Sequence, residues 1–294
     1  MATRPLATLL AGAIDYAGLF PPADLTMADA VRNYDGYLDS EDAWALGRFI
    51  VPASRLSEFQ EEVKPYFSES NVWKLSVLSG TNINEDLKQI TDFNSRHANH
   101  AIIDTIEARA SSSTEVQSIA SVIPKSFHVF IEIPIAVDPT ELIRSIGKAE
   151  VNTKVRTGGI TANAFPAATD VERFIRICVA ENVKFKATAG LHHPIRSEYN
   201  LTYKPDSERG KMYGYLNIFL AAAFIRNGMK REDAIAVLDE ESADAFRFSD
   251  EGVEWRSFHL SNDQLQHTRK NVALSFGSCS FREPLDDLKA MKLL

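Results

Sequence analysis

The chain has 294 residues, of which 45% are hydrophobic, and its formal net charge is −8. This acidic balance disfavours nucleic acid and anionic membrane surfaces as partners, because phosphate-bearing surfaces select basic proteins. The two cysteines, Cys178 and Cys279, cannot form a disulfide framework or a CxxC pair, which fits a reducing compartment such as the cytoplasm.

The apolar stretches of the chain do not predict a secreted or membrane protein. The apolar run near the start is short and meets Asp15, which argues against a signal peptide. The longest apolar run, Tyr215–Ile225, is too short to span a bilayer and contains Asn217. We therefore expect a cytoplasmic protein in which this run forms a buried helix.

Short apolar strands alternate with amphipathic helices along the chain. We expect strands at residues 9–16, 45–52, 72–79, 101–108, 127–135, 151–157, 183–189 and 245–249. We expect helices at residues 26–40, 54–67, 83–97, 113–123, 139–149, 169–181, 214–228 and 261–275, with an additional short helix at 231–240.

Eight strands, each followed by a helix, predict an α/β fold of the (β/α)8 TIM-barrel type, formed by residues 1–294 as one domain. An open doubly wound sheet is the alternative, but neither GxGxxG nor GxxxxGK[ST] follows any expected strand. Residues 191–213 are polar and aromatic and predict an extended loop after the seventh strand. The residues beyond the eighth strand predict an extra carboxyl-terminal segment.

Two lysines lie near the ends of the sixth and seventh expected strands, and each is soon followed by glycine. Lys154 precedes Gly158, and Lys186 precedes Gly190. Barrel enzymes carry their chemistry at the carboxyl ends of the strands, so we expect the two amines to meet there. One ammonium lowers the pKa of a neighbouring amine, and a neutral lysine can attack a carbonyl group. The pattern therefore indicates imine (Schiff-base) chemistry.

Several carboxylates lie among apolar neighbours in the expected strands. Asp15, Asp104 and Glu132 belong to the first, fourth and fifth strands. An unpaired carboxylate in such surroundings is costly, so Asp104 needs a cationic partner, and a lysine across the barrel would serve. A single inward pair of this kind is commonly a structural ion pair. Two lysines together with several carboxylates favour a functional site.

Other side chains are expected near the same end of the barrel. Alternation along a strand sends Arg156 to the side of Lys154, and Thr188 to the side of Lys186. Arg156 and Arg196 could bind an acidic group of a substrate, or they could pair with the surplus carboxylates.

The loop after the seventh strand begins with two histidines, His192 and His193. Adjacent residues of an extended chain point apart, so a shared metal ion is not expected. One histidine is expected to contact the substrate, with loop packing as the alternative. Residues 277–280, Gly-Ser-Cys-Ser, offer hydroxyls and backbone donors, and here an ordinary turn is favoured over a phosphate site.

Several segments resemble deoxyribose-phosphate aldolases. The segment Lys154–Gly158 resembles the Lys-x-x-Thr-Gly segment on strand six of that family, and Lys186–Gly190 resembles Lys-Ala-Ser-Gly-Gly on strand seven. The order and approximate spacing hold from about residue 10 to residue 196. The remaining similar segments are residues 129–144 (strand five and its helix), Ile103–Ile106 (strand four) and Ile14–Pro21 (the opening segment).

The resemblance implies a (β/α)8 barrel with class I aldolase chemistry and no cofactor or metal. Lys154 would form the imine, Lys186 would hold the pKa of Lys154 down, and Asp104 would relay protons. The family's phosphate-binding turn of strand eight has no clear match near residues 245–253, so deoxyribose 5-phosphate is not the expected substrate. The residues expected to contact the substrate are Asp15, Glu132, Arg156, Thr188, His192, His193 and Arg196.

The expected enzyme is therefore a carbon–carbon lyase that acts on a small carbonyl compound, which could carry an acidic group. A metal-assisted lyase or isomerase that uses carboxylates with His192 or His193 is one alternative. A barrel that only binds a small molecule is another. Assembly into a homo-oligomer is left open by the sequence.

Overall fold

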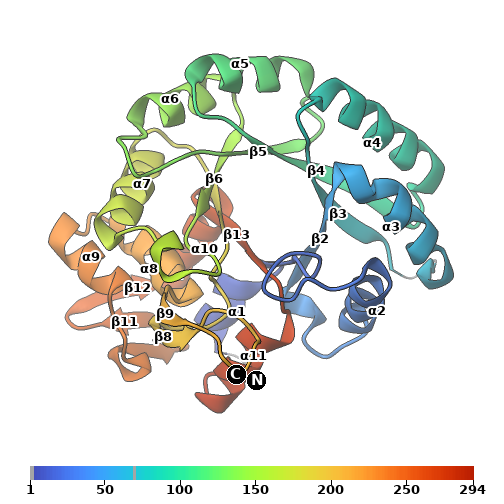
Figure 1. Ribbon diagram of the computed structural model, residues 1–294. Coiled ribbons are helices and arrows are strands. Elements are labelled where there is room, and N and C mark those ends of the chain that lie inside the picture. Colours follow the sequence, from blue (N-terminus) through green and yellow to red (C-terminus); the bar gives the residue numbers. More distant parts are fainter. Residues whose placement is uncertain (1–2, 69–70) are drawn as a thin grey trace.

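Eight parallel strands close into a barrel in the computed structural model, which describes residues 3–68 and 71–294 (Figure 1). Each strand pairs with its neighbour along the chain, and the last strand, β13, pairs with both β7 and β1. The predicted (β/α)8 barrel is confirmed. Its strands are β1 (Ile14–Tyr16), β2 (Leu46–Pro52), β3 (Trp73–Leu78), β4 (Ala101–Arg109), β5 (His128–Glu132), β6 (Asn152–Arg156), β7 (Phe185–Thr188) and β13 (Ala273–Ser278).

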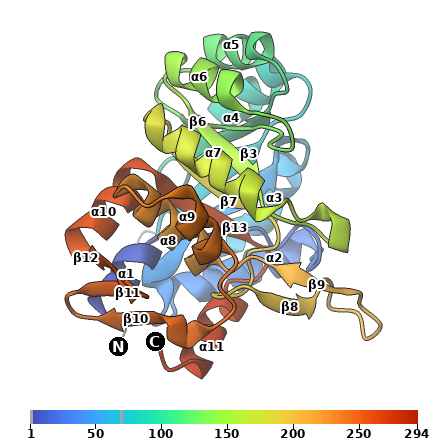
Figure 2. The ribbon, with the colours of Figure 1, turned by 90° about the vertical axis from the view of Figure 1, so that its left-hand side faces the viewer.

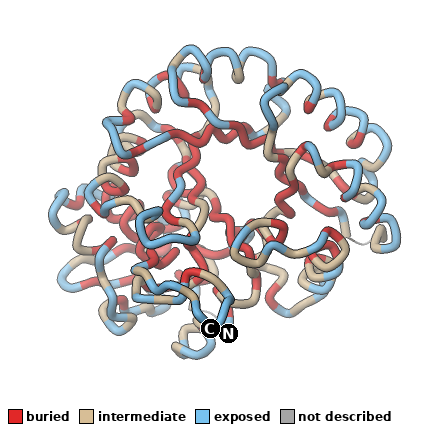
Figure 3. The backbone as a smooth tube through the Cα atoms, in the orientation of Figure 1, coloured by how far each residue is buried: buried red, intermediate tan, exposed pale blue. Residues whose placement is uncertain are grey.

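Helices surround the barrel and cover the outer faces of the strands (Figure 1). In Figure 3 the buried residues follow the strands and the inner faces of the helices, while the outer turns of the helices are exposed. Burial on both faces explains why the strands read as short apolar runs. The helices that follow the barrel strands are α2 (Met27–Leu38), α3 (Leu56–Val63), α4 (Ile83–His97), α5 (Ser113–Val122), α6 (Thr140–Lys148), α7 (Ala168–Ala180), α8 (Tyr215–Arg226) and α11 (Arg282–Ala290).

The eighth barrel strand lies later in the chain than the sequence predicts. The expected strand at 245–249 is β10 (Phe246–Ser249), which forms an antiparallel sheet with β11 (Gly252–Trp255) and β12 (Phe258–Ser261). Its alternation of apolar and polar residues suits such a half-exposed sheet better than a barrel. The residues expected as an extra carboxyl-terminal segment therefore supply the last strand and the last helix of the barrel.

Two more expected elements, one near each end of the chain, differ from the structure in type or length. The expected strand at 9–16 is wrong in its first half, because α1 (Arg4–Leu10) is a helix and β1 begins at Ile14. The expected helix at 261–275 is α10 (Asn262–Asn271), which ends before β13. Short 3-10 helices occupy Ala43–Ala45, Ala53–Arg55, Lys64–Tyr66, Ala162–Ala164 and Ala243–Ala245.

The connection from β7 to α8 contains a two-stranded sheet, β8 (Ser197–Asn200) and β9 (Arg209–Met212). Figure 2 shows this hairpin projecting beside the barrel, in keeping with the expected extended loop. The apolar run at Tyr215–Ile225 is buried throughout, as predicted. Contacts of α8 with α7, α9 (Arg231–Leu238) and α10 explain why no face of this helix is polar. No helix in the described part of the chain is long and apolar enough to cross a membrane.

Candidate active site

A row of charged side chains crosses four neighbouring strands of the barrel. The strand register pairs Arg109 of β4 with Glu132 of β5, Glu132 with Lys154 of β6, and Lys154 with Lys186 of β7. Paired residues of adjacent strands point to the same side of the sheet, so these side chains gather inside the barrel. The structure thus brings together the two lysines that the sequence placed on adjacent strands.

Glu107 of β4 joins the two lysines. Its Oε2 atom lies 2.7 Å from Lys154 Nζ, and its Oε1 atom lies 2.6 Å from Lys186 Nζ. The hydroxyl of Ser76 also donates to Oε1, at 2.6 Å. A second carboxylate flanks each amine, with Asp15 Oδ2 2.6 Å from Lys186 and Glu132 Oε2 2.9 Å from Lys154. The two lysine amines therefore share one buried carboxylate.

Ion pairing outweighs burial in this cluster. Burial disfavours a charged Lys186, but Asp15 and Glu107 more than compensate and raise its pKa above the usual 10.5. Burial likewise disfavours an ionised Glu107, yet Lys154 and Lys186 hold its pKa well below the usual 4.5. At neutral pH the structure thus holds Lys186 as an ammonium and Glu107 as a carboxylate.

Asp15 is buried beside Lys186 and does not line the cavity that contains Lys154, which differs from its expected role as a substrate contact. Its Oδ1 accepts a hydrogen bond from the backbone N–H of Arg48 at 2.7 Å, and its Oδ2 accepts one from Ser275 at 2.9 Å. A Cβ atom at Gly47 would lie 2.3 Å from Oδ1, so the glycine leaves room for the carboxylate. Asp15 thus positions Lys186 and supplies its counter-charge.

Asp104 has the cationic partner that the sequence requires, but this partner is an arginine and not a lysine. Its carboxylate binds Arg48 of β2 through two contacts, Nε–Oδ1 at 2.5 Å and Nη2–Oδ2 at 2.8 Å. The register between β3 and β4 shifts at this point, because Leu75 pairs with Ile103 whereas Ser76 pairs with Thr105. The extra residue in β4 changes which side chains face inward. Glu107, which simple alternation along the strand does not place inward, takes the place expected for Asp104.

A cavity of about 320 Å³ lies at the carboxyl ends of the strands, and Lys154 reaches it. Lys186 is fully buried and does not line it. Lys154 is therefore the amine that a bound molecule can meet. The cavity is lined by Ala17, Phe20, Pro21, Pro22, Ile50, Leu78, Glu107, Arg109, Lys154, Arg156, Gly159, Ile160, Thr188, Ala189, Gly190, His192, Gly277 and Cys279.

The glycines that follow the two lysines leave room for a phenylalanine ring to pack over the ends of β6 and β7. A Cβ atom at Gly158 would lie 2.3 Å from the ring of Phe165, and one at Gly190 would lie 2.7 Å from the same ring. Gly190 also has a φ of +71°, which favours glycine. One phenylalanine thus packs over both strand ends, which accounts for the Lys…Gly spacing in the sequence.

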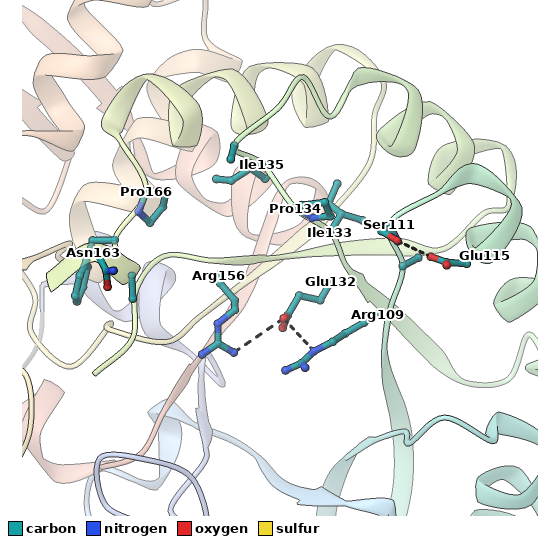
Figure 4. Close-up of a pocket in the computed structure, with 14 residues that line it drawn as sticks. Arg109, Ser111, Glu115, Glu132, Ile133, Pro134, Ile135, Arg156, Asn163 and Pro166 are labelled. Atoms are coloured by element: carbon teal, nitrogen blue, oxygen red, sulfur yellow. Dashed lines mark hydrogen bonds and ion pairs between the residues drawn. The ribbon is translucent and has the colours of Figure 1, made fainter. Parts of the chain in front are cut away.

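Four of the expected substrate contacts lie at the mouth of the barrel. Arg156, Thr188 and His192 line the cavity of about 320 Å³. Glu132 lines an adjoining cavity of about 620 Å³, in which Arg109 and Arg156 also take part (Figure 4). Arg109, which was not among the expected site residues, follows Glu107 on the inner face of β4.

His193 and Arg196 lie elsewhere, so the structure does not support them as substrate contacts. The His193 ring stacks on Tyr199 at 3.5 Å between centroids, and its Nδ1 lies 2.6 Å from Asp287 Oδ2. The Arg196 guanidinium lies over the ring of Tyr213 and 3.4 Å from Asp239. The alternative of loop packing therefore describes His193, and pairing with a surplus carboxylate describes Arg196.

His192 and Cys279 form a second polar group on the cavity wall. His192 Nδ1 lies 3.6 Å from Cys279 Sγ and 3.5 Å from Glu283 Oε2. Burial lowers the pKa of His192 to about 4 and raises the pKa of Cys279 to about 11. Both groups are uncharged at neutral pH. Residues 277–280 end β13 and lead into α11, which brings this cysteine to the site.

The fold and the site together define a (β/α)8 barrel with a buried pair of lysines at the carboxyl ends of its strands. Among residues 3–68 and 71–294, no group of three or more His, Cys, Asp or Glu side chains is arranged to hold a metal ion. Comparison of the chain with protein-family models, with curated proteins and with solved structures found no match.

Proposed function

We propose that the protein is a carbon–carbon lyase of the class I aldolase type, a divergent relative of deoxyribose-phosphate aldolases, in which Lys154 forms an imine with a small carbonyl compound. One observation carries the proposal: two lysines share the carboxylate of Glu107, and only Lys154 reaches the cavity. Glu107 is the carboxylate that can take a proton from Lys154. Lys186, a buried ammonium held by Asp15, keeps Glu107 in place on its other side.

The two carboxylates beside Lys154 can carry the protons that imine formation requires. Glu107 Oε2, 2.7 Å from Nζ, accepts a proton from the ammonium. The nitrogen lone pair then forms a bond to the carbonyl carbon, and the carbonyl oxygen takes the proton from Glu107. The carbinolamine loses its oxygen as water after a second proton transfer from nitrogen. In sum, the ammonium and the carbonyl yield an iminium and one water.

The iminium then accepts the electron pair of a breaking carbon–carbon bond. As that bond breaks, the β-hydroxyl proton passes to a carboxylate and the departing fragment leaves as an aldehyde or ketone. The resulting enamine takes up a proton at carbon, and water hydrolyses the iminium to restore Lys154. Glu132, whose Oε2 lies 2.9 Å from Nζ, is the second carboxylate placed to exchange these protons.

Reductive trapping tests the proposal. We expect borohydride to fix a panel of small aldehydes and ketones to the protein, with the adduct found by peptide mass mapping on Lys154. The variant Lys154→Ala should abolish this adduct, because Lys186 does not reach the cavity. Lys211→Ala, which removes a half-exposed surface lysine, is the matched control. Adducts spread over surface lysines, or unchanged in Lys154→Ala, would contradict the proposal, as would ligand binding without turnover.

A second prediction distinguishes the role of Glu107 in proton transfer from that of Asp104. Because Asp104 pairs with Arg48 and not with a lysine, Asp104→Asn is expected to leave trapping on Lys154 in place. It should lower the free energy of unfolding by about 2 kcal/mol, the usual loss for a hydrogen-bonded charged pair. Urea unfolding and the trapping assay measure the two effects. If the variant stays folded but loses the adduct, Asp104 would be the residue that relays the proton.

A further inference from the structure

Two arginines flank Glu132 at the mouth of the barrel, on the side from which a molecule reaches Lys154. Arg109 Nε lies 3.2 Å from Glu132 Oε1, and Arg156 Nη1 lies 4.0 Å from the same oxygen. Figure 4 shows both guanidinium groups pointing toward this carboxylate. Both arginines also line the cavity that contains Lys154.

The two guanidinium groups have hydrogen-bonding capacity to spare. Each carries five N–H donors, and Glu132 is the only carboxylate in ion-pair contact with either one among the described residues. The side chains are 71% and 50% exposed, so these donors face solvent and the cavity. The other oxygen of Glu132 is engaged by Lys154. An anionic group on a ligand could therefore bind both arginines without displacing a buried contact.

The network of connected ion pairs around Lys154 leaves one positive charge in excess. Four cations face three carboxylates when both lysines are protonated, which gives a net charge of +1 in a chain of net charge −8. The same excess holds after imine formation, because the iminium keeps the positive charge of Lys154. The connected groups are Arg109, Lys154, Arg156 and Lys186 with Asp15, Glu107 and Glu132.

We propose that the substrate is a small oxo acid whose single carboxylate binds Arg109 and Arg156 while its carbonyl carbon meets Lys154. One carboxylate neutralises the excess charge, whereas a dianionic phosphate would leave the site with net negative charge. Arginine is also suited to bidentate recognition of a carboxylate. The inference rests on the proposed function, since the carbonyl is placed by the imine.

The geometry of Glu132 limits the size of this oxo acid. One oxygen of its carboxylate contacts the amine and the other faces the arginines, so the amine and the guanidinium groups are separated by the width of one carboxylate and its contacts. The carbonyl and the carboxylate of the substrate must therefore lie within a few bonds of each other. The two cavities that Lys154 lines, of about 320 Å³ and about 840 Å³, both fall within the range of small-molecule pockets.

Trapping with three matched probes tests the inference. Pyruvate carries a ketone and a carboxylate, hydroxyacetone carries a ketone without a charge, and dihydroxyacetone phosphate carries a ketone and a phosphate. We expect pyruvate to label Lys154 at the lowest concentration. Arg109→Gln and Arg156→Gln should each raise its half-saturating concentration about tenfold, the effect of losing a charged hydrogen bond. Arg247→Gln removes an arginine that is also exposed and paired with a glutamate, and serves as the control.

A ligand that binds without forming an imine tests the arginine site independently of the proposed function. Lactate has the carboxylate of pyruvate but no carbonyl, and calorimetry should show that it binds the native protein and binds each arginine variant more weakly. Lactate binding of this kind without any Lys154 adduct would support the arginine site and contradict the aldolase proposal. Labelling of Lys154 by all ketones without dependence on the arginines would overturn the inference alone. Stronger labelling by the phosphate probe would overturn it as well.

Discussion

Replacing Lys186 with methionine is expected to lower the free energy of unfolding by about 3–5 kcal/mol near neutral pH, the usual cost of removing one partner from a buried ion pair. The ammonium lies 2.6 Å from both Asp15 and Glu107, and its side chain is fully buried. Methionine fills a similar volume but leaves these carboxylates facing an apolar group. Urea unfolding of the native chain and of the variant measures the loss.

The loss of stability in Lys186→Met should become smaller at high pH. The pKa of Lys186 is raised in the folded protein, so its contribution is fully present below the unfolded value of 10.5. It disappears as the pH rises above 10.5 through the folded value. The difference between the native chain and Lys186→Met is therefore expected to shrink in that alkaline range.

Two further variants check the cause of this loss. Lys64→Met removes an exposed lysine that pairs with Glu61, and a much smaller change is expected there. Combining Lys186→Met with Asp15→Asn should cost less than the sum of the two single changes, because the second change neutralises a carboxylate that the first leaves unpaired. Equal stability of Lys186→Met and the native chain would show that the ion pairs do not hold this part of the barrel together.

The lysine pair could be predicted from the sequence because its signals are local. Each lysine lies in a short strand that is followed two residues later by a glycine, and the helix between the strands makes the two strands parallel neighbours. The right-handed strand–helix–strand unit then brings the two amines to the same end of the sheet. No long-range information was needed to place Lys154 beside Lys186.

The carboxylate between the lysines could not be predicted in the same way. Simple alternation along β4, counted from Asp104, selects Ile106 and Ala108 for the inner face. The register shift between Ile103 and Thr105 places an additional residue in the strand and turns Glu107 inward. Such a bulge depends on the neighbouring strand, so it has no signature within the strand itself.

The eighth strand was missed for a related reason. β13 is interrupted by a polar residue, Ser275, which reads as a break in an apolar run but donates a hydrogen bond to Asp15 inside the barrel. The segment Phe246–Ser249 alternates more regularly and was therefore expected to be the eighth barrel strand, although it belongs to an antiparallel sheet. The two positions that depart from a strand pattern, Glu107 and Ser275, both belong to the polar site.

Replacing Glu107 with glutamine is expected to have the largest combined effect on stability and on chemistry. The carboxylate is 2% exposed and contacts both lysines, so its loss should lower the free energy of unfolding by about 3–5 kcal/mol near neutral pH. It should also abolish trapping on Lys154, because an amide cannot carry the proton between the amine and the carbonyl oxygen. Ser76→Ala, which removes only the hydroxyl that donates to Glu107, is the milder comparison.

The sign of the pH dependence distinguishes this role from simple packing. The lysines lower the pKa of Glu107 in the folded protein, so its contribution is fully present above the unfolded value of 4.5 and is lost as the pH falls below 4.5 toward the folded value. The stability difference between the native chain and Glu107→Gln should therefore decrease as the pH falls below 4.5, provided both remain folded enough to be titrated with urea. If glutamine instead costs the same at every pH, the side chain acts through its shape. If the folded variant still forms the Lys154 adduct at the native rate, another group relays the proton, and Glu132 is then the nearest carboxylate to the amine.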